Sequence, residues 1–298
     1  MNIRQIETFL VLADCLSVTE TAETLHCTQP AVSARIRGLE EALDVVLFDR
    51  INKRMHLTAA GLVFVDYARK MVGVLEAAGE HLRQMDDPLS GTVSFGASNF
   101  IGIYLIPAFL GDYARGAPKV EFELDISPST QLLGKLEANK LEFLILSDHI
   151  ALDEARYRFR HLCSDEMVLI AAPDHRLARA GRCSIADLAR EIFLIKAAPS
   201  ATRTFLLDRI AAQGGSLGRE MHISSIEAIK QSVMHGLGIS ILSRFTVTHE
   251  LDLGLLREIP IRGNFDRGIR VVHRRDKLLS PAAARFLDRL GEEWTDRP

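Results

Sequence analysis

Hydrophobic residues near the N-terminus recur every three or four positions, which is the spacing of amphipathic α-helices. This pattern predicts one helix over residues 3–14 and a second over Val18–Leu25. A third helix is expected over Thr28–Leu43, where Pro30 fits the first turn because no helical partner awaits its missing N–H group. The inner faces of the three helices carry Ile3, Ile6, Phe9, Leu10, Ala13, Ala22, Leu25, Val32, Ile36, Leu39 and Leu43. Three short helices around one small core are therefore expected.

The following segment changes its pattern twice. Val46–Leu57 is strand-like at both ends around an Asn52-Lys53-Arg54 turn, which predicts a small two-stranded wing. Thr58 then caps a long helix over residues 59–85. The apolar line of this helix consists of Leu62, Val65, Ala68, Met71 or Val72, Leu75, Ala78, Leu82 and Met85. The line has no partner nearby in the sequence, so we expect it to pair with a second copy of the chain.

Beyond a linker at Asp86–Gly91, strands alternate with helices, as is typical of α/β structure. One group of strands is expected at Thr92–Ala97, Val120–Ile126 and Phe143–Leu146. A second group is expected at Val168–Ala172, Phe193–Ile195, Met221–Ile223 and Ile239–Leu242. Arg270–His273 is expected to return to the first group before a helix over Pro281–Trp294. Two α/β lobes joined by two chain crossings enclose a hinged cleft.

These patterns together predict an α+β multidomain protein. Its parts are a winged helix-turn-helix over residues 1–58, a linker and dimerisation helix over 59–87, and a two-lobed α/β domain over 88–298. Within the last part, lobe I is expected at about residues 92–161 and 268–298, and lobe II at about 162–267.

The composition is that of a soluble globular protein, with 47% hydrophobic and 25% charged residues in 298. No apolar run is long enough for a transmembrane helix, and the acidic Glu7 does not fit a secretory signal. We therefore expect no membrane association and a cytoplasmic location. The cysteines form no CxxC pair, so neither a metal site nor a disulfide framework is expected from Cys15, Cys27, Cys163 and Cys183.

The net charge of −3 gives no general support for nucleic-acid binding. Residues 1–87 even carry nine Lys and Arg against 13 Asp and Glu, so DNA binding has to rest on where particular cations lie. Five cations cluster within Arg35–Arg54, whereas Glu40, Glu41 and Asp44 lie beyond the reading end of the third helix. The local charge thus favours a DNA-facing surface despite the acidic total.

The third helix carries side chains that suit the major groove of DNA. Gln29 suits adenine, Arg35 suits guanine or a phosphate, and Ala31 can contact a thymine methyl group beside Pro30. Phosphate contacts are expected from Thr28, Ser33, Arg37, Arg50, Lys53 and Arg54. The alternative is an ordinary three-helix bundle whose polar face is simply solvated.

The stretch TAETLHCTQPAVSARIRGLEEALDVVLFDR, followed by LTAAG, closely resembles the N-terminus of LysR-type transcriptional regulators. The matching residues are Ala22, Leu25, Gln29, Pro30, Ala31, Val32, Ser33, Ile36, Leu39, Glu40, Leu43, Leu47, Phe48, Arg50, Leu57, Thr58 and Gly61. So many matches at fixed spacing are far more specific than one short motif. Two residues depart from the family pattern: Thr21 replaces a small alanine, and Asp44 replaces a glycine after the reading helix, where a left-handed backbone suits glycine best.

The resemblance implies a bacterial, non-enzymatic regulator that binds partly palindromic promoter DNA as a homodimer or homotetramer. It implies pairing through residues 59–85 and a C-terminal effector domain similar to periplasmic binding proteins. RNA polymerase is a further expected partner.

Polar residues follow the predicted strands, where ligands settle in open α/β sheets and helix N-termini offer free N–H groups. The candidate effector-binding residues are Ser98, Asn99, Ser129, Thr130, Ser147, Lys196, Ser200, Thr202, Arg203 and Ser224. Any one Ser or Thr among them also suits an ordinary helix cap. The cations Lys196 and Arg203 favour an effector with a carboxylate or phosphate, and no other cofactor is expected.

Other classes of function find less support. The glycines of His235–Ser240 follow a helix and precede a strand, whereas a phosphate loop needs the reverse order. The chain holds no HExxH motif, no Ser/His/Asp set can be argued from the spacing, and no catalytic residue is assigned. Two alternatives stay open: an enzyme or transport-type binding protein with a dimerising N-terminus, and a redox sensor that uses Cys163 and Cys183.

Overall fold

The computed structural model describes the chain except for residues 52–53, 85–86, 88 and 296–298. The chain divides into two compact units, and each is described by itself. The first comprises Met1–Asp87 with Gly134–Leu141, and the second comprises Pro88–Leu133 with Glu142–Pro298. The predicted linker at Asp86–Gly91 lies partly outside the described residues.

The first unit begins with three short helices around an aromatic core. They are α1 (Ile3–Cys15), α2 (Val18–Thr24) and α3 (Gln29–Leu43). The Thr28 side chain accepts a hydrogen bond from the backbone of Ala31 and so caps α3, as its sequence position predicts. In the core, the Phe9 ring lies 4.9 Å from that of Phe64 and 5.4 Å from that of Phe48.

Two antiparallel strands form the wing, β1 (Phe48–Ile51) and β2 (Arg54–Leu57), and α4 (Ala59–Gln84) follows them. Asp44, the departure from the family pattern, ends α3 in the left-handed conformation at φ 54°. Gly61 near the start of α4 is required by close packing, because a Cβ atom there would lie 2.2 Å from the Leu47 carbonyl oxygen. The winged helix-turn-helix and long helix predicted from the sequence are thus confirmed.

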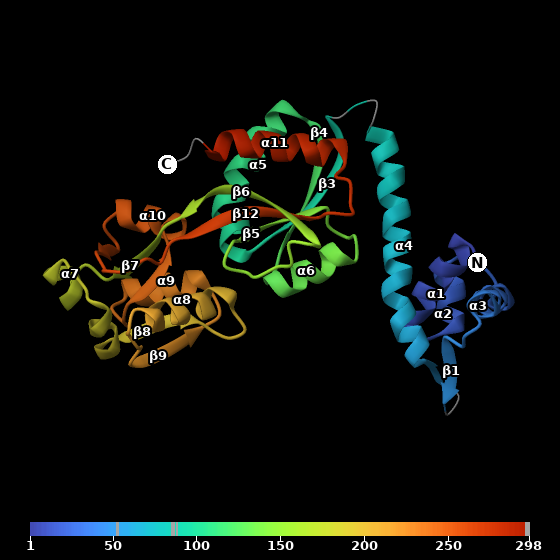
Figure 1. Ribbon diagram of the computed structural model, residues 1–298, viewed down its shortest axis with the longest axis horizontal. Coiled ribbons are helices and arrows are strands. Elements are labelled where there is room, and N and C mark those ends of the chain that lie inside the picture. Colours follow the sequence, from blue (N-terminus) through green and yellow to red (C-terminus); the bar gives the residue numbers. More distant parts are fainter. Residues whose placement is uncertain (52–53, 85–86, 88, 296–298) are drawn as a thin grey trace. The chain divides into compact units, whose positions relative to one another are not determined.

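Lobe I of the second unit is a five-stranded sheet covered by helices (Figure 1). Its strands are β3 (Ser90–Ala97), β4 (Lys119–Ile126), β5 (Phe143–Ser147), β6 (Tyr157–Asp165) and β12 (Arg267–Arg274). The order is β4-β3-β5-β12-β6, with β3 parallel to β4 and β5 and with β12 antiparallel to its neighbours. The helices are the π-helix η1 (Ile101–Leu105), α5 (Ile106–Gly116), α11 (Pro281–Thr295) and the first part of α6 (Ser129–Glu137), whose residues from Gly134 on are grouped with the first unit. Phe286 of α11 anchors the core, with its ring 5.3 Å from Phe95.

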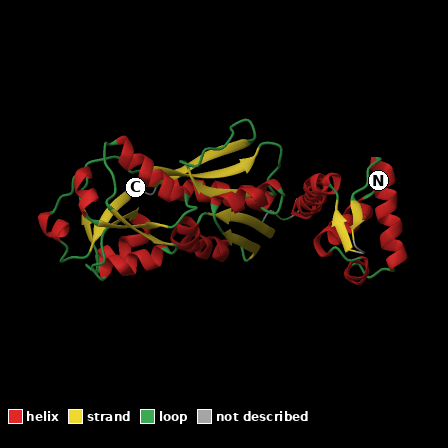
Figure 2. Cartoon of the chain, turned by 90° about the horizontal axis from the view of Figure 1, so that it is seen from below, coloured by secondary structure: helices red, strands yellow, loops and turns green. Residues whose placement is uncertain are grey.

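Lobe II holds the remaining strands and helices, which alternate along the chain (Figure 2). Its strands are β7 (Met167–Ala171), β8 (Ile192–Lys196), β9 (Arg219–Ile223), β10 (Ser240–Ser243) and β11 (Arg257–Ile259). Its helices are α7 (Arg176–Ala180), the 3-10 helix η2 (Ile185–Arg190), α8 (Ala201–Ala212), α9 (Ile226–Met234) and α10 (Arg244–Asp252). β7 pairs antiparallel with β10 and β11, and β8 is parallel to β9.

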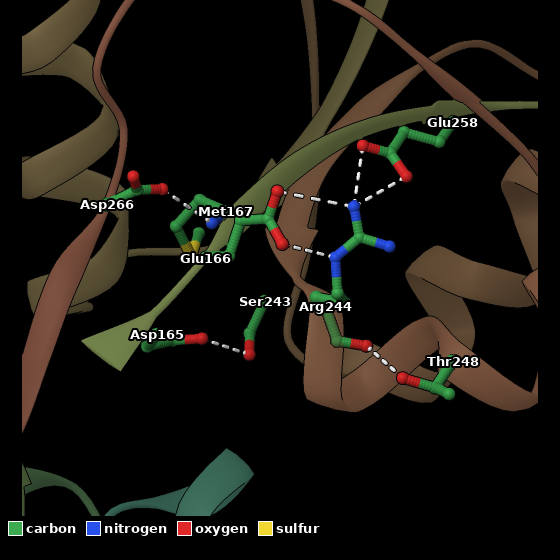
Figure 3. A network of polar contacts seen from close by, with 8 residues as sticks. All are labelled: Asp165, Glu166, Met167, Ser243, Arg244, Thr248, Glu258 and Asp266. Atoms are coloured by element: carbon green, nitrogen blue, oxygen red, sulfur yellow. Dashed lines mark hydrogen bonds and ion pairs between the residues drawn. The ribbon is translucent and has the colours of Figure 1, made fainter. Parts of the chain in front are cut away.

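The chain crosses between the lobes twice, between β6 and β7 and again at the start of β12. Polar contacts connect these crossings to lobe II (Figure 3). Arg244 at the start of α10 forms ion pairs with Glu166 and Glu258, and Ser243 donates to the Asp165 carboxylate. The Nε atom of Arg267 lies 2.7 Å from Asp165, and both side chains are almost fully buried. The crossings are therefore fixed to each other by a buried ion pair.

Candidate nucleic-acid interface and ligand cleft

The N-terminal half of α3 presents a polar surface opposite its buried face. Val32, Ile36 and Leu39 are buried against the rest of the unit. The exposed residues are Thr28, Gln29, Pro30, Ser33, Ala34 and Arg37, with Ala31 half-buried. This surface brings together the predicted base and phosphate contacts of the third helix with one exception, Arg35.

The side chain of Arg35 differs from its predicted role. It is half-buried, and its guanidinium donates to the Thr8 hydroxyl at 3.3 Å and lies 4.0 Å from the Cys27 sulfur. The reason is its place on the helix, three residues after the buried Val32, because residues three apart share a helix face. Arg35 therefore borders the buried side of α3 in this structure.

Gln29 lies on the exposed face of α3, and a hydrogen bond holds its side chain in one orientation. Its amide nitrogen donates to the Thr19 hydroxyl of α2 at 3.1 Å, and this bond fixes the side chain across the two helices. The remaining residues predicted to contact phosphates belong to the wing. Lys53 and the side chains of Arg50 and Arg54 lie outside the described part of the structure.

The helix α4 carries large apolar side chains that the single chain leaves exposed. Leu62, Leu75 and Leu82 of the predicted apolar line are 61%, 54% and 67% exposed. A groove of about 460 Å³ at the start of α4 adds Val45, Val63 and Tyr67 to this surface. Ala68 of the same line is instead buried within its own unit, beside Phe64. An exposed apolar surface of this extent is typical of a protein–protein contact.

A cavity of about 380 Å³ lies between the two lobes of the second unit. The predicted effector-binding residues that line it are Ser98, Asn99, Ser129, Thr130, Ser147, Lys196, Ser200, Thr202 and Ser224. They come from separate strand ends and helix starts because parallel strands bring their carboxyl ends to one edge of a sheet. Nine of the ten predicted effector-binding residues therefore line one cavity.

Arg203 is the predicted residue that does not line the cavity. Its guanidinium pairs with the Glu220 carboxylate of β9 at 2.8 Å. Ser200 caps α8 by accepting a hydrogen bond from the Arg203 backbone, so the cap determines which side chains of the first turn face the cleft. Thr202 faces it, and its hydroxyl accepts from Arg267 at 3.0 Å.

The charge of the cavity wall is positive. Lys196 donates to the Ser224 carbonyl, and burial lowers the pKa of its ammonium group. Among the described residues that line the cavity, none is Asp or Glu. One cation, several hydroxyl groups and nearby helix N-termini make a chemical environment that suits a small anion.

His149 also lines the cavity, although it is not among the effector-binding residues predicted from the sequence. Its ring lies 4.9 Å from that of Phe205 on α8. Burial, with a smaller effect of Arg267, lowers its pKa to about 4, so the imidazole is uncharged at neutral pH. The available signal was its position, two residues after the predicted Ser147 at the end of β5.

The two cysteines considered as a redox pair lie in different cores. Cys163 packs against the core of lobe I, and Cys183 belongs to a core of lobe II. Burial raises the pKa of the Cys183 thiol to about 11, far above that of a reactive thiolate. The structure thus gives no support to a redox switch between them.

Two family profiles match the chain. The profile described as a bacterial regulatory helix-turn-helix protein of the lysR family matches residues 3–62, and that of the LysR substrate binding domain matches residues 86–295. The RuBisCO operon transcriptional regulator of Allochromatium vinosum is 30% identical over 96% of this chain and 94% of its own. The regulator CbbR of Rhodospirillum rubrum is 32% identical over 95% of this chain and 93% of its own.

Solved structures show the same arrangement. The CcmR regulatory domain of Synechocystis, in complex with 2-PG, is 26% identical with a TM-score of 0.64, covering 70% of this chain and 100% of that one. A full-length OxyR variant from Pseudomonas aeruginosa has a TM-score of 0.73 at 22% identity, covering 99% and 95%. CbnR complexed with its target DNA has a TM-score of 0.67 at 21% identity, covering 98% and 99%. The last two likenesses concern the fold alone.

A winged helix-turn-helix joined to a two-lobed ligand-binding domain defines a ligand-responsive DNA-binding regulator. The chain belongs to the LysR family of bacterial transcriptional regulators, which bind promoter DNA, oligomerise and carry an effector-binding domain. Its relatives are regulators and not enzymes, as the sequence predicted. Nowhere in the described residues is a helix long and apolar enough to cross a bilayer.

Proposed function

We propose that a small anion in the cleft between the lobes modulates promoter binding by this regulator. The observation that carries the proposal is the wall of the 380 Å³ cavity, in which Lys196 and hydroxyl groups from both lobes meet without a carboxylate among its described lining residues. A ligand that contacts both lobes favours their closed arrangement by its differential affinity for that state. The CcmR domain, which is 26% identical, holds 2-PG, and this supports an anionic effector here.

We further propose that two chains pair through the helix at residues 59–85. The exposed Leu62, Leu75 and Leu82 support this pairing, since burying them against a second copy removes a large apolar area from water. The dimer presents α3 twice to a promoter site in the cytoplasm, and two dimers form a tetramer that contacts RNA polymerase. Leu75→Glu is expected to convert the dimer to a monomer in analytical ultracentrifugation, and an unchanged mass would overturn the pairing.

On DNA, the exposed face of α3 is proposed to lie in the major groove. Gln29 contacts base edges, and Thr28, Ser33 and Arg37 hold phosphates. Arg50, Lys53 and Arg54 of the wing are likewise proposed to contact phosphates of the DNA. Arg35 is proposed to orient α3 through Thr8, and it reaches the DNA only if it leaves that bond.

The proposal is tested by adding small anions, 2-PG among them, to the full chain bound to a labelled duplex from upstream of its own gene. Lys196→Met is expected to weaken the anion's effect by about 10- to 100-fold, because a hydrogen bond to a charged group is lost. Arg203→Met is the matched control, since this cation lies in the same lobe but outside the cavity. A response that is equal in wild type and Lys196→Met would contradict the anionic cleft.

A further inference from the structure

Two residues of lobe I that line the cavity carry buried polar atoms without a hydrogen-bond partner among the described residues. The hydroxyl oxygen of Ser98 and both ring nitrogens of His149 are buried and have no hydrogen-bond partner among the described residues. Both residues line the cavity. Ser98 follows β3 and His149 follows β5, and the backbone N–H of Ser98 donates to the Ile145 carbonyl at 3.2 Å, so the two groups sit on neighbouring strand ends. Buried polar groups are normally paired, so these atoms point to a ligand.

The surroundings of His149 keep its ring uncharged. Arg267 and Arg270 of β12 lie near it and disfavour a second positive charge, as does its burial against Phe205. Asp148 and the backbone of Ala201 oppose this effect only in part. An uncharged imidazole has one N–H donor and one nitrogen that accepts. The ring therefore needs both an acceptor and a donor to satisfy it.

Among the described residues, lobe II brings an acceptor near the ring, although not within hydrogen-bond geometry of either nitrogen. The backbone group of Ala201 that favours the charged ring is its carbonyl, which accepts hydrogen bonds and can pair only with the N–H side of the imidazole. The second nitrogen is left as an acceptor. A carboxylate or an ionised phosphate offers only acceptors, so a plain anion cannot satisfy that nitrogen. A hydroxyl group on the ligand can.

We propose that His149 is a specificity-determining residue of this cleft, and that with Ser98 it selects an effector carrying a hydroxyl group beside its anionic group. The inference rests on the proposed function, because it concerns the same cavity and adds the second half of the ligand. Lys196 and the helix N-termini receive the anion from lobe II, and the hydroxyl of the ligand donates to the imidazole nitrogen from lobe I. An acid that carries a hydroxyl group can contact both Lys196 in lobe II and His149 in lobe I.

The test uses calorimetry on the full chain with probes that differ only by one hydroxyl group. L-malate is compared with succinate, and glycerate 3-phosphate with its 2-deoxy analogue. We expect the hydroxylated member of at least one pair to bind about 10- to 100-fold more tightly, because its absence leaves a buried acceptor unpaired. His149→Phe is expected to remove that preference.

Three variants separate the specificity from the anion site. His149→Gln keeps a donor and an acceptor, and it is expected to restore part of the preference. Lys196→Met is expected to weaken both members of a pair by the same factor and to leave their ratio unchanged. His235→Phe replaces an exposed imidazole outside the cavity and is expected to change neither affinity. Ser98→Ala gives a second measurement of the preference if His149→Phe does not fold.

The outcomes distinguish this inference from the proposed function. If the anions bind but the paired probes bind equally, or if His149→Phe and Ser98→Ala both keep the preference, the hydroxyl selection is wrong and the anionic cleft stands. If no member of either pair binds, the anionic effector fails together with the inference. A preference that His149→Phe abolishes and His149→Gln partly restores supports it.

Discussion

The DNA-reading helix and the effector cleft differ in how their functional residues are assembled. On α3, the exposed polar residues proposed to contact DNA all lie from Thr28 to Arg37, and one N-cap and one buried face orient them. In the cleft, Ser98 and Ser224 are contributed by different lobes and are separated by more than 120 positions. A reading surface on one helix tolerates change elsewhere, whereas the cleft depends on how two lobes are held. Perturbing the crossings should therefore affect the cleft and spare α3.

The largest effect is expected from Arg267→Met, which leaves the buried Asp165 carboxylate with the Ser243 hydroxyl but without its positive partner. Removing one partner of a buried ion pair costs about 3–5 kcal/mol. Urea unfolding should show this loss for the second unit, with the N-terminal unit unchanged. Arg203→Met removes a cation from a more exposed pair and should cost less than about 1 kcal/mol. Equal losses in the two variants would show that burial of the Asp165 pair is unimportant.

A smaller effect is expected from pH, through His149. Its pKa is about 4 in the folded chain against 6.5 for an ordinary histidine, so the unfolded chain binds more protons between these values. The free energy of unfolding should be largest above pH 6.5 and fall as the pH drops toward 4. The His149 contribution is at most about 3 kcal/mol, and less where solvent reaches the partly buried ring.

Chemical unfolding of wild type and His149→Phe at several pH values measures this contribution. The difference between their stabilities should change between pH 6.5 and 4 and be constant outside this range. A difference that stays constant throughout would mean that His149 titrates normally.

The smallest effects are expected on α3, where two exposed residues about two turns apart should behave differently. Gln29→Ala should weaken a specific promoter site by about 1–3 kcal/mol and leave random duplexes almost unaffected. Arg37→Ala should lower the affinity for all duplexes by the same factor. It should also reduce the slope of the logarithm of the binding constant against the logarithm of the salt concentration by about 1. Fluorescence anisotropy at several salt concentrations distinguishes them. If Gln29→Ala weakens random DNA as much as the promoter, its base-reading role is wrong.

Helices and caps were predictable because their determinants are local. Thr28 caps α3 and Thr58 caps α4, and in each case the side chain accepts from a backbone N–H three residues later. The strand β6 was not predicted, because Arg158, Arg160 and His161 interrupt its apolar pattern at the edge of the sheet. An edge strand needs only one buried face, so its sequence carries a weak signal.

The direction of side chains at the two sites was harder to predict from the sequence than the helices and caps. Lys196 and Arg203 carry the same charge close together in sequence, yet Lys196 lines the cavity and Arg203 pairs with Glu220. The same difficulty applies to Arg35, whose direction depends on Thr8 far back in the chain. The pKa of His149 is lowered by burial, which includes a ring contact with Phe205, and by Arg267, and the fold brings both residues from distant segments. Such properties depend on tertiary contacts and not on spacing.

The buried contact between Asp165 and Arg267 has a mechanical consequence. Because each residue lies on a different strand passing from lobe to lobe, those strands cannot slide past one another without separating two charges away from water. Sliding of the crossings is thereby opposed, so we expect the lobes to move by bending about an axis at the crossings. The Thr202 hydroxyl on the cavity wall is bound to the same guanidinium, so a ligand that displaces Thr202 acts directly on that axis.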